Sequence, residues 1–401
     1  MSATKHSWES KVRSTVRGTE MNGFTVQEVF HRFYSAYRSN HAVSAEQEKA
    51  AFCIMNCKTG KLGANVSVCE ECGCVQIHYN SCRNRCCPMC QELPKLKWID
   101  ARKEDVLDAP YFHVVFTVPE ELNPVIFSNQ RLLYDAMYHA ASATLLELCG
   151  SPKHLGAKVG FISILHTWGS AMNYHPHIHV ILLGGGLDQY NQWRDRGGKF
   201  FLPVKILSKL FRGKYMAELK SLWADAKLQF YGTAKRFQNH YEFQDLIDIC
   251  YSKEWVPYCK PSFNGAQSVI NYLGKYTHRI AISNYRIISI DEENVAFSVK
   301  DYKNAGRWKT MQISGIEFIR RFLMHVPPKG FVRIRHYGLL SSRCKAVSLS
   351  VCRNALNSRK YKSLLKNLNV PDMLETLFGK CKCKECGGIL KLKYSRIHLR
   401  I

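Results

Sequence analysis

Short apolar, β-branched runs bounded by glycine and proline predict strands along the middle of the chain. The clearest run is residues 177–183, after which the three glycines 184–186 are expected to end the strand. Side chains alternate on a strand, so His177 and His179 share one face and the apolar residues between and after them pack on the other. Two imidazoles on one rigid face make half of a metal site. The alternative is a pair of histidines at the edge of the core, bonded to backbone groups.

Two further runs, residues 111–118 and 160–168, predict strands beside the histidine strand. The connection that follows residue 168 is short, so the second run should pair antiparallel with the histidine strand as a hairpin. His166 then falls roughly opposite the start of the histidine strand, which makes it the favoured third metal ligand. His113 and Gln267 are rivals for that role, and His166 could equally be a core or solvent-exposed residue.

Other segments follow the helical spacing of apolar positions or the alternation of strands. Ser44 opens a helix with the character of a capping box. Helices are predicted over residues 26–37, 124–149, 204–230, 264–279 and 315–325, and strands over 285–290, 295–300 and 307–313.

The predicted helix over residues 264–279 buries an apolar face with i, i+3, i+4, i+7 spacing. Tyr272 and Tyr276 lie one turn apart on a flank of that face, whereas Lys275 points to solvent. The two hydroxyls could therefore reach a site on the sheet that the helix covers. The commoner role of such a pair is to cover the edge of a core.

Cysteines gather near the N-terminal end: nine of the 17 lie between residues 53 and 90. Two pairs have the C-x-x-C spacing that presents two thiolates to one zinc ion. We expect structural zinc bound by Cys69, Cys72, Cys87 and Cys90, with a second site drawn from Cys57, Cys82 and Cys86. A purely structural clip is the alternative, and a redox role is disfavoured because no βαβ pattern surrounds the pairs. Near the other end, Cys381, Cys383 and Cys386 form half of a further site, with His398 as a distant fourth candidate.

The net charge of the chain indicates what kind of partner it binds. Its 57 Lys and Arg against 32 Asp and Glu leave a net charge of +25, which indicates a polyanion, most simply nucleic acid. No apolar run approaches the ~20 residues of a membrane span, and the first residues lack the apolar core of a signal peptide. We therefore expect a cytoplasmic, nucleoid-associated protein with reduced thiols and no membrane partner. The expected DNA contacts are Arg83, Arg85, Lys275, Arg279, Arg333 and Arg335.

These features belong together in DNA strand cleavage. A divalent ion held by histidines stabilises charge on an attacked phosphate, and a tyrosine hydroxyl is a suitable nucleophile. The chain resembles the HUH transposases encoded by rolling-circle insertion sequences of the insertion-sequence-ninety-one type. The resemblance rests on NSCRNRCCPMCQ (80–91), FHVVFTVP (112–119), LHTWGSAMNYHPHIHVILLGGGL (165–187), YLGKYTHRIAISNYR (272–286) and EFIRRFLMHVPPKGFVRIRHYGLL (317–340).

The resemblance implies that His177 and His179 are the metal-binding pair and that Tyr272 and Tyr276 are the nucleophiles. It implies Mg²⁺ or Mn²⁺ as the catalytic metal, beside structural Zn²⁺. It also implies an α+β fold, with a central antiparallel sheet of the ferredoxin-like type, the histidines on a middle strand and the tyrosine helix beside it.

The sequence departs from the family pattern at a few positions. Cys86 and Asn65 stand where the family usually has histidine, which leaves the zinc ligand set open. Small single-tyrosine relatives carry a glutamine four residues after the nucleophile. Tyr276 and Ile280 occupy those positions here, so a third catalytic ligand must come from elsewhere.

We expect four units: a helical arm (1–50), a zinc-binding domain of the ribbon or knuckle type (51–105), an HUH catalytic domain (106–330) and a basic C-terminal region (331–401). The predicted function is a transposase that nicks and rejoins single-stranded or hairpin-containing element ends through a 5′-phosphotyrosine intermediate, either as a monomer or as an oligomer. The alternatives are a plasmid rolling-circle replication initiator or relaxase, and a non-catalytic zinc-containing DNA-binding regulator. A zinc hydrolase that uses the H-x-H pair is a more distant alternative.

Overall fold

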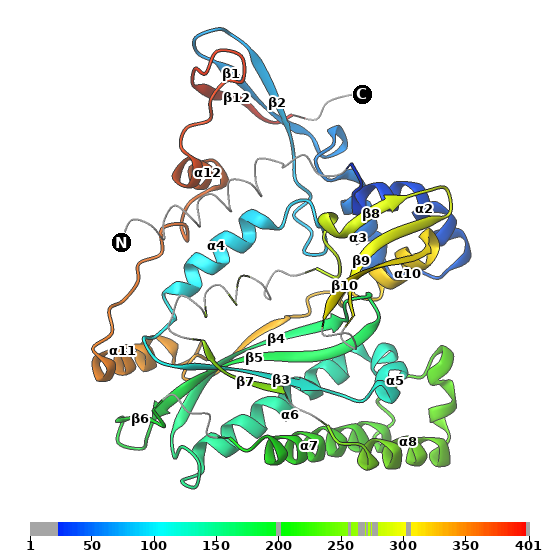
Figure 1. Cartoon of the computed structure of the whole chain (residues 1–401), viewed down its shortest axis with the longest axis vertical. Coiled ribbons are helices and arrows are strands. Elements are labelled where there is room, and N and C mark those ends of the chain that lie inside the picture. Colours follow the sequence, from blue (N-terminus) through cyan, green and yellow to red (C-terminus); the bar gives the residue numbers. More distant parts are fainter. Residues whose placement is uncertain are drawn as a thin grey trace.

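The computed structural model describes residues 23–197, 202–255, 258–263, 269, 272, 274, 280–301 and 306–397. A six-stranded antiparallel sheet crosses its middle (Figure 1). The strand order is β11-β4-β5-β3-β7, and β6 pairs with β5. Its strands are β3 (Tyr111–Thr117), β4 (Lys158–Trp168), β5 (Tyr174–Leu187), β6 (Trp193–Asp195), β7 (Tyr258–Phe263) and β11 (Ile334–Gly338).

The histidine strand β5 lies in the centre of this sheet, between β4 and β3. The predicted β4–β5 hairpin is confirmed, and its register places His166 directly opposite His177. The predicted alternation also holds: Ile178 and Val180 join the core on one face, whereas Ile181 joins the core on the other. A middle strand fixes its backbone by hydrogen bonds on both edges, so the side chains that it carries are held rigidly.

The expectation that the glycines end the histidine strand was wrong, because β5 continues through them to Leu187. They allow close approach of neighbouring backbone. A Cβ on Gly184 would lie 2.9 Å from the carbonyl oxygen of Pro110, and one on Gly185 would lie 2.7 Å from that of Arg194. Glycine inside a strand here marks close packing rather than a turn.

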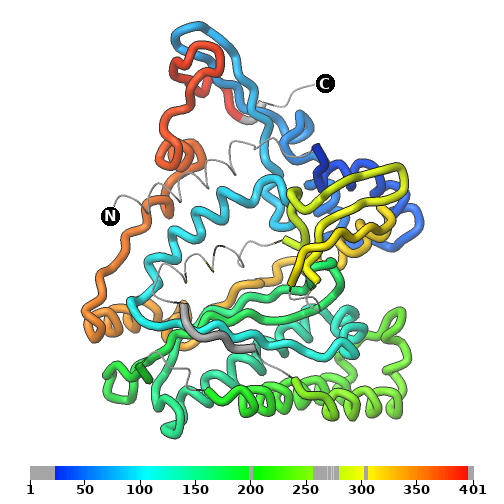
Figure 2. Tube along the Cα trace, viewed as in Figure 1, coloured from blue at the N-terminus to red at the C-terminus, as the bar shows by residue number. Residues whose placement is uncertain are grey.

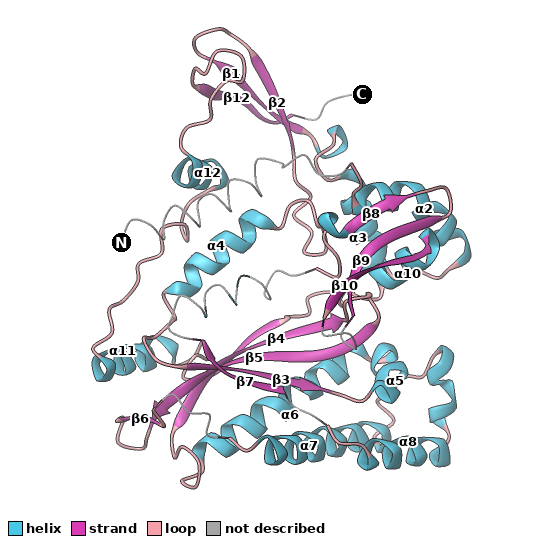
Figure 3. Cartoon of the chain, in the orientation of Figure 1, coloured by secondary structure: helices cyan, strands magenta, loops and turns pink. Residues whose placement is uncertain are grey.

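Helices cover one face of the central sheet and form the largest core with it (Figures 1 and 3). They are α5 (Asn123–Ser128), α6 (Gln130–Gly150), α7 (Val204–Ala224) and α8 (His240–Ser252). The single helix predicted over 124–149 breaks at Asn129, whose amide donates to the carbonyls of Val125 and Gln229. A side chain that bonds to backbone in this way competes with helix continuation.

The N-terminal helices do not stand apart as an arm, because they pack against segments that lie far from them in the sequence. Helices α2 (Val26–Asn40) and α3 (Ala45–Asn56) share a core with α10 (Gly315–Leu323) and with the sheet of β8 (Ile287–Ile290), β9 (Asn294–Asp301) and β10 (Arg307–Ser314). The rings of Phe30 and Phe322 meet edge-on at 5.1 Å. The predicted capping box at Ser44 is present, with Gln47 as its partner. This core thus crosses the predicted domain boundaries at residues 50 and 105, and the pairing of β11 with β4 crosses the one at residue 330.

A third sheet joins the two ends of the described chain in the order β12-β1-β2. Its strands are β1 (Ala64–Cys69), β2 (Val75–Tyr79) and β12 (Leu390–Ile397). Helix α12 (Val370–Phe378) lies next below this sheet, whereas α4 (Glu92–Lys103) leads back toward the central sheet and α11 (Lys345–Leu356) contacts β6 (Figure 1). Figure 2 shows this as red chain lying against blue chain at the top of the molecule. Among the described residues, no helix is long and apolar enough to cross a membrane.

Candidate active site and cysteine clusters

Three histidines of the central sheet bring their ring nitrogens together. One nitrogen from each of His166, His177 and His179 lies within 4.8 Å of the others. His166 comes from β4, and the other two come from the same face of β5. The predicted opposition of these strands is what makes the cluster.

Backbone contacts orient the first ring of the β5 pair. Nδ1 of His177 lies 2.7 Å from the carbonyl oxygen of His175, which can only accept, so Nδ1 carries the hydrogen. In the neutral ring Nε2 then presents a lone pair, and it lies 3.1 Å from Nε2 of His179. Two ligand nitrogens each about 2.1 Å from one cation are themselves about 3.0–3.4 Å apart. The spacing fits a shared cation, and the set of imidazole donors suits a transition metal such as Mn²⁺ better than Mg²⁺.

Tyr272 reaches this cluster from the other side of His179. Its hydroxyl lies 3.3 Å from Nδ1 of His179 and forms a short hydrogen bond with Nε2 of His113. Nε2 of His113 is in turn 2.9 Å from Nδ1 of His179. His113, weighed from the sequence as a rival metal ligand, therefore lies against the tyrosine hydroxyl. Three buried side chains, His113, His179 and Tyr272, form one connected hydrogen-bonded group.

The cysteines group differently from the sequence expectation. The first cluster consists of Cys57, Cys82, Cys87 and Cys90, with all four sulfur atoms within 4.8 Å of one another. Cys69 and Cys72 were expected to join Cys87 and Cys90 and do not. The reason is that β1 carries the 69/72 pair away from this cluster to the far end of the third sheet.

The protonation of the first cluster shows why it suits a cation. Hydrogen bonds from Cys82, Cys87 and Cys90 lower the pKa of Cys57, whereas the contact with Cys57 raises the pKa of both Cys82 and Cys87. The pKa of Cys90 is lowered as well, so two of the four adjacent sulfurs favour negative charge and the other two keep their protons. A divalent cation removes the repulsion between thiolates, and zinc takes four thiolates in a tetrahedral site.

The second cluster consists of Cys69, Cys72, Cys383 and Cys386, again with all four sulfurs within 4.8 Å. The half-site predicted near the C-terminal end therefore meets its other half more than 300 residues earlier in the chain, as the separation of 311 between Cys72 and Cys383 shows. Cys381, predicted as part of that half-site, is exposed and lies outside the cluster.

Cys86, expected as a ligand of a second zinc, belongs to neither cluster. It is buried in the core formed by the N-terminal helices, where burial raises the pKa of its thiol. The one-residue step from Cys87 turns its side chain away from the first cluster.

Two of the predicted DNA-contacting arginines have partners inside the protein. Arg85 donates to the carbonyl oxygens of Phe331 and Pro328, at 2.6 and 3.0 Å. Arg335 pairs with Asp135 and lies over the ring of Tyr138 at 4.1 Å. The guanidinium groups of both thus hold the fold together. Arg83 is exposed and Arg333 is half-buried.

Several predicted residues lie outside the described part of the chain, namely Tyr276, Lys275, Arg279, Gln267 and His398. What sequence reasoning missed is the contact of His113 with Tyr272 and the partnership of the two distant C-x-x-C pairs. The repeated C-x-x-C-G motif at residues 69–73 and 383–387 was the available signal that the two distant pairs are partners.

Comparison with known proteins gives the class of the chain. A family model described as "Transposase zinc-binding domain", of the IS91 type, matches residues 29–118, and one described as "Putative transposase" matches residues 160–347. The chain therefore belongs to the IS91-type transposase family and carries its N-terminal zinc-binding domain. That membership confirms the resemblance drawn from the sequence, and the cysteine clusters fit Zn²⁺ as a cofactor.

Individual relatives agree. The chain is 41% identical over 337 residues to "Putative transposase y4qJ" of Sinorhizobium fredii (strain NBRC 101917 / NGR234), covering 84% of this chain and 85% of the relative. It is 26% identical over 296 residues to the transposase for insertion sequence element IS801 of Pseudomonas savastanoi pv. phaseolicola, covering 72% of this chain and 69% of that protein.

Among solved structures, the conjugative relaxase TrwC in complex with oriT DNA, in a copper-bound structure, aligns with 27% of this chain and 42% of its own. The sequence identity is 14% and the TM-score is 0.23. That overlap is too small to carry an argument about this chain.

Proposed function

We propose that this transposase nicks and rejoins single-stranded DNA at the ends of its element, in the manner of an HUH endonuclease with a ferredoxin-like catalytic sheet. The observation that carries the proposal is the contact of the Tyr272 hydroxyl with the His113 and His179 side chains, next to the histidine cluster. A nucleophile, an acceptor for its proton and a set of metal ligands thus lie within one connected group.

His166, His177 and His179 are proposed to hold the catalytic Mg²⁺ or Mn²⁺, of which the nitrogen donors favour Mn²⁺. Such an ion, when bound, supplies positive charge to a non-bridging phosphate oxygen as negative charge develops during attack. If Nε2 of His179 were a ligand of that ion, Nδ1 of the same ring would carry the hydrogen. That N–H has two neighbours, Nε2 of His113 at 2.9 Å and the phenol oxygen of Tyr272 at 3.3 Å, and it is available to the phenol oxygen once Nε2 of His113 is protonated.

The proposed cleavage step uses residues of this chain, the DNA and solvent. Nε2 of His113 takes the proton of the Tyr272 hydroxyl, while the Nδ1–H of His179 stabilises the phenolate. The phenolate oxygen attacks the phosphorus, the bond to the 3′ oxygen breaks, and that oxygen takes a proton from water to leave as a 3′-hydroxyl. A 5′-phosphotyrosine ester remains, which a 3′-hydroxyl can attack in the reverse reaction.

Tyr276 is proposed as a second nucleophile on the family resemblance alone. Two tyrosines one helical turn apart would let one hold a cut strand while the other attacks a second strand. Arg83 and Arg333 remain proposed phosphate contacts, because a net charge of +25 calls for a polyanionic partner.

The test is to incubate the protein with single-stranded element ends and Mn²⁺ and to look for a covalent adduct that survives denaturation. We expect a DNA-linked peptide that contains Tyr272 or Tyr276, and no adduct from the double Tyr→Phe variant. Tyr285→Phe is a matched control, because Tyr285 is exposed and outside the site. An adduct that persists in the double variant would remove both tyrosines from the mechanism. Salt-sensitive DNA binding without any cleavage would support the regulator instead. Faster cleavage of a plasmid origin than of element ends would support the replication initiator.

A further inference from the structure

Two C-x-x-C-G turns from opposite ends of the chain have the same backbone geometry. In the first, the N–H of Gly73 donates to the carbonyl of Cys69 at 3.1 Å, and the N–H of Cys69 donates to the carbonyl of Cys74 at 2.9 Å. In the second, Gly387 donates to Cys383 at 3.1 Å, and Cys383 donates to Gly388 at 2.7 Å.

The glycine after each second cysteine has the same positive φ, +69° at Gly73 and +77° at Gly387. L side chains rarely adopt this conformation, so both turns depend on glycine at the same place. The two segments are therefore the same structural element, a tight knuckle that turns two sulfurs to one side.

The knuckles lie side by side at one end of the third sheet. Sγ of Cys69 lies 3.4 Å from Sγ of Cys386, and Sγ of Cys72 lies 3.7 Å from Sγ of Cys383. Sulfurs bound tetrahedrally to one zinc ion at about 2.3 Å are about 3.8 Å apart. Strand β12 leaves the second knuckle and pairs antiparallel with β1, with Cys69 opposite Leu390.

We propose that Cys69, Cys72, Cys383 and Cys386 bind a zinc ion of their own, in a site that exists only when the two ends of the chain are together. The matched zinc-binding domain ends at residue 118 and holds only half of these ligands. The protein then binds two zinc ions, one within the matched domain at Cys57, Cys82, Cys87 and Cys90, and one shared between its two ends.

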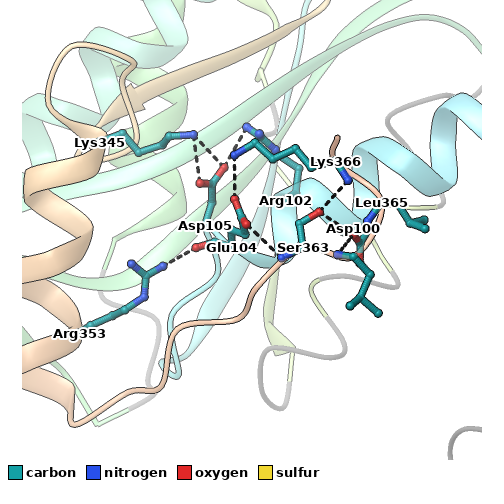
Figure 4. Close-up of polar contacts among 10 residues, drawn as sticks. Asp100, Arg102, Glu104, Asp105, Lys345, Arg353, Ser363, Leu365 and Lys366 are labelled. Carbon is teal, nitrogen blue, oxygen red and sulfur yellow. Dashed lines mark hydrogen bonds and ion pairs between the residues drawn. The ribbon is translucent and has the colours of Figure 1, made fainter. Parts of the chain in front are cut away.

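The path between the catalytic sheet and the second knuckle is held without metal (Figure 4). The carboxylate of Asp100 on α4 accepts hydrogen bonds from the Ser363 hydroxyl at 2.6 Å and from the Leu365 N–H at 2.8 Å. Glu104 pairs with Lys366 at 3.0 Å. These contacts tie residues 363–366 to the C-terminal end of α4, so the chain that leads on to α12 and the second knuckle starts from a fixed point. The shared zinc ion then holds the other end of this segment, at the second knuckle.

The test is the zinc content of the intact protein, measured by native mass spectrometry. We expect two zinc ions per chain in the wild type and one in Cys383→Ser/Cys386→Ser. Cys69→Ser/Cys72→Ser should also bind one. Cys381→Ser is the matched control and should keep two, because this exposed cysteine lies outside the cluster. Two zinc ions in the 383/386 variant, or one in the wild type, would overturn the proposal.

Hydrogen exchange gives a readout that does not depend on counting metal. In Cys383→Ser/Cys386→Ser, amides of β1, β2 and β12 should lose protection, whereas those of the core around α2 and α10 should keep it. Unchanged protection in the third sheet would show that metal does not hold the ends together. Full loss of free thiols at these four cysteines without bound zinc would show disulfides in place of a metal site.

Discussion

The hydroxyl of Tyr272 lies 3.3 Å from Nδ1 of His179, although the two residues are 93 positions apart in the chain. The other nitrogen of the same ring, Nε2, lies 3.1 Å from Nε2 of His177. One imidazole therefore faces the tyrosine with one nitrogen and the histidine cluster with the other. A change in charge at the histidine cluster therefore acts on the Tyr272 hydroxyl through one imidazole ring, that of His179.

His113 is predicted to act as the base for Tyr272. Replacing it by Gln removes the proton acceptor but keeps a hydrogen-bonding side chain next to the hydroxyl. We expect the rate of adduct formation in a single turnover to fall by ~10²–10⁴ at neutral pH, the usual contribution of a general base. The variant should recover part of its rate at high pH, where hydroxide removes the proton. A variant with the wild-type pH–rate profile would argue for a positioning role only.

The histidine cluster is predicted to bind the catalytic metal. His177→Ala and His179→Ala should each weaken Mn²⁺ binding by at least the ~10–100-fold that losing a supporting contact costs, and should abolish nicking. Chelation of the wild type should stop nicking, and added Mn²⁺ should restore it more fully than Mg²⁺ does.

The control for the metal prediction is His175→Gln. His175 is on the same strand but outside the cluster; the substitution keeps the backbone carbonyl that contacts His177 and removes only a ring contact with centroids 5.1 Å apart. Titration calorimetry with Mn²⁺ should give the wild-type affinity for this variant. Equal loss in His175→Gln and His177→Ala would point to damage of the strand rather than to a lost ligand.

Much of this site follows from short-range pattern. A short connection forces β4 and β5 into a hairpin, and the alternation of side chains then sets His166 against His177. The contact of His113 with Tyr272 joins residues 159 positions apart in the chain, which neither spacing nor propensity specifies. The glycines after His179 were misread for the same reason, since only the neighbouring carbonyl of Pro110 shows that they permit close approach.

The zinc ligands show more clearly what the sequence alone does not specify. A C-x-x-C pair predicts a knuckle wherever it occurs, because its geometry is local. Which knuckles share an ion depends on strand pairing, and β12 pairs with β1 across most of the chain. Proximity in sequence favoured Cys87 and Cys90 as partners for Cys69 and Cys72, and the topology of the third sheet decided otherwise.

His325 is predicted to make the protein less stable in mild acid. Burial lowers the pKa of His325 to about 4, and its ring lies between the hydroxyl of Thr167 and the carbonyl of Met172. An unfolded histidine takes a proton near pH 6.5, so between pH 6.5 and 4 the unfolded state binds more protons. The stability contributed by the neutral ring is complete above pH 6.5 and falls by up to ~3 kcal/mol as the pH drops to 4.

His325→Gln keeps one donor and one acceptor but does not titrate. The difference between urea unfolding free energies at pH 7.5 and pH 5 should therefore be smaller in this variant than in the wild type. His31→Gln, a substitution on the exposed face of α2, should leave the difference unchanged. A wild-type pH dependence in His325→Gln would mean that other groups account for the acid sensitivity.

Asp100 is predicted to anchor the chain that leads from α11 back to the third sheet. Although burial raises the pKa of Asp100, hydrogen bonds from Ser363, Leu365 and Tyr361 lower it below the ordinary 3.8. The stabilisation is therefore present above that pH and is lost as the pH falls through the folded-state pKa. Asp100→Asn keeps the size of the side chain but replaces an acceptor oxygen by a donor facing two backbone N–H groups, those of Leu364 and Leu365. We expect a loss of about 2 kcal/mol, as for hydrogen bonds to a charged group.

That loss should be local, because α4 keeps its contact with the rest of the protein through Asp105, which pairs with Lys345 at 3.0 Å. Limited proteolysis should cut Asp100→Asn between α11 and α12 faster than it cuts the wild type. Asp108→Asn, at an exposed aspartate beyond the end of α4, should be cut at the wild-type rate. Chelation of zinc should accelerate cleavage near the second knuckle in all of these proteins. The reason is that the contacts of Asp100 and the shared zinc ion hold different parts of the same segment. Equal cleavage between α11 and α12 in Asp100→Asn and the wild type would mean that the contacts of Glu104 with Lys366 and Arg353 suffice to hold it.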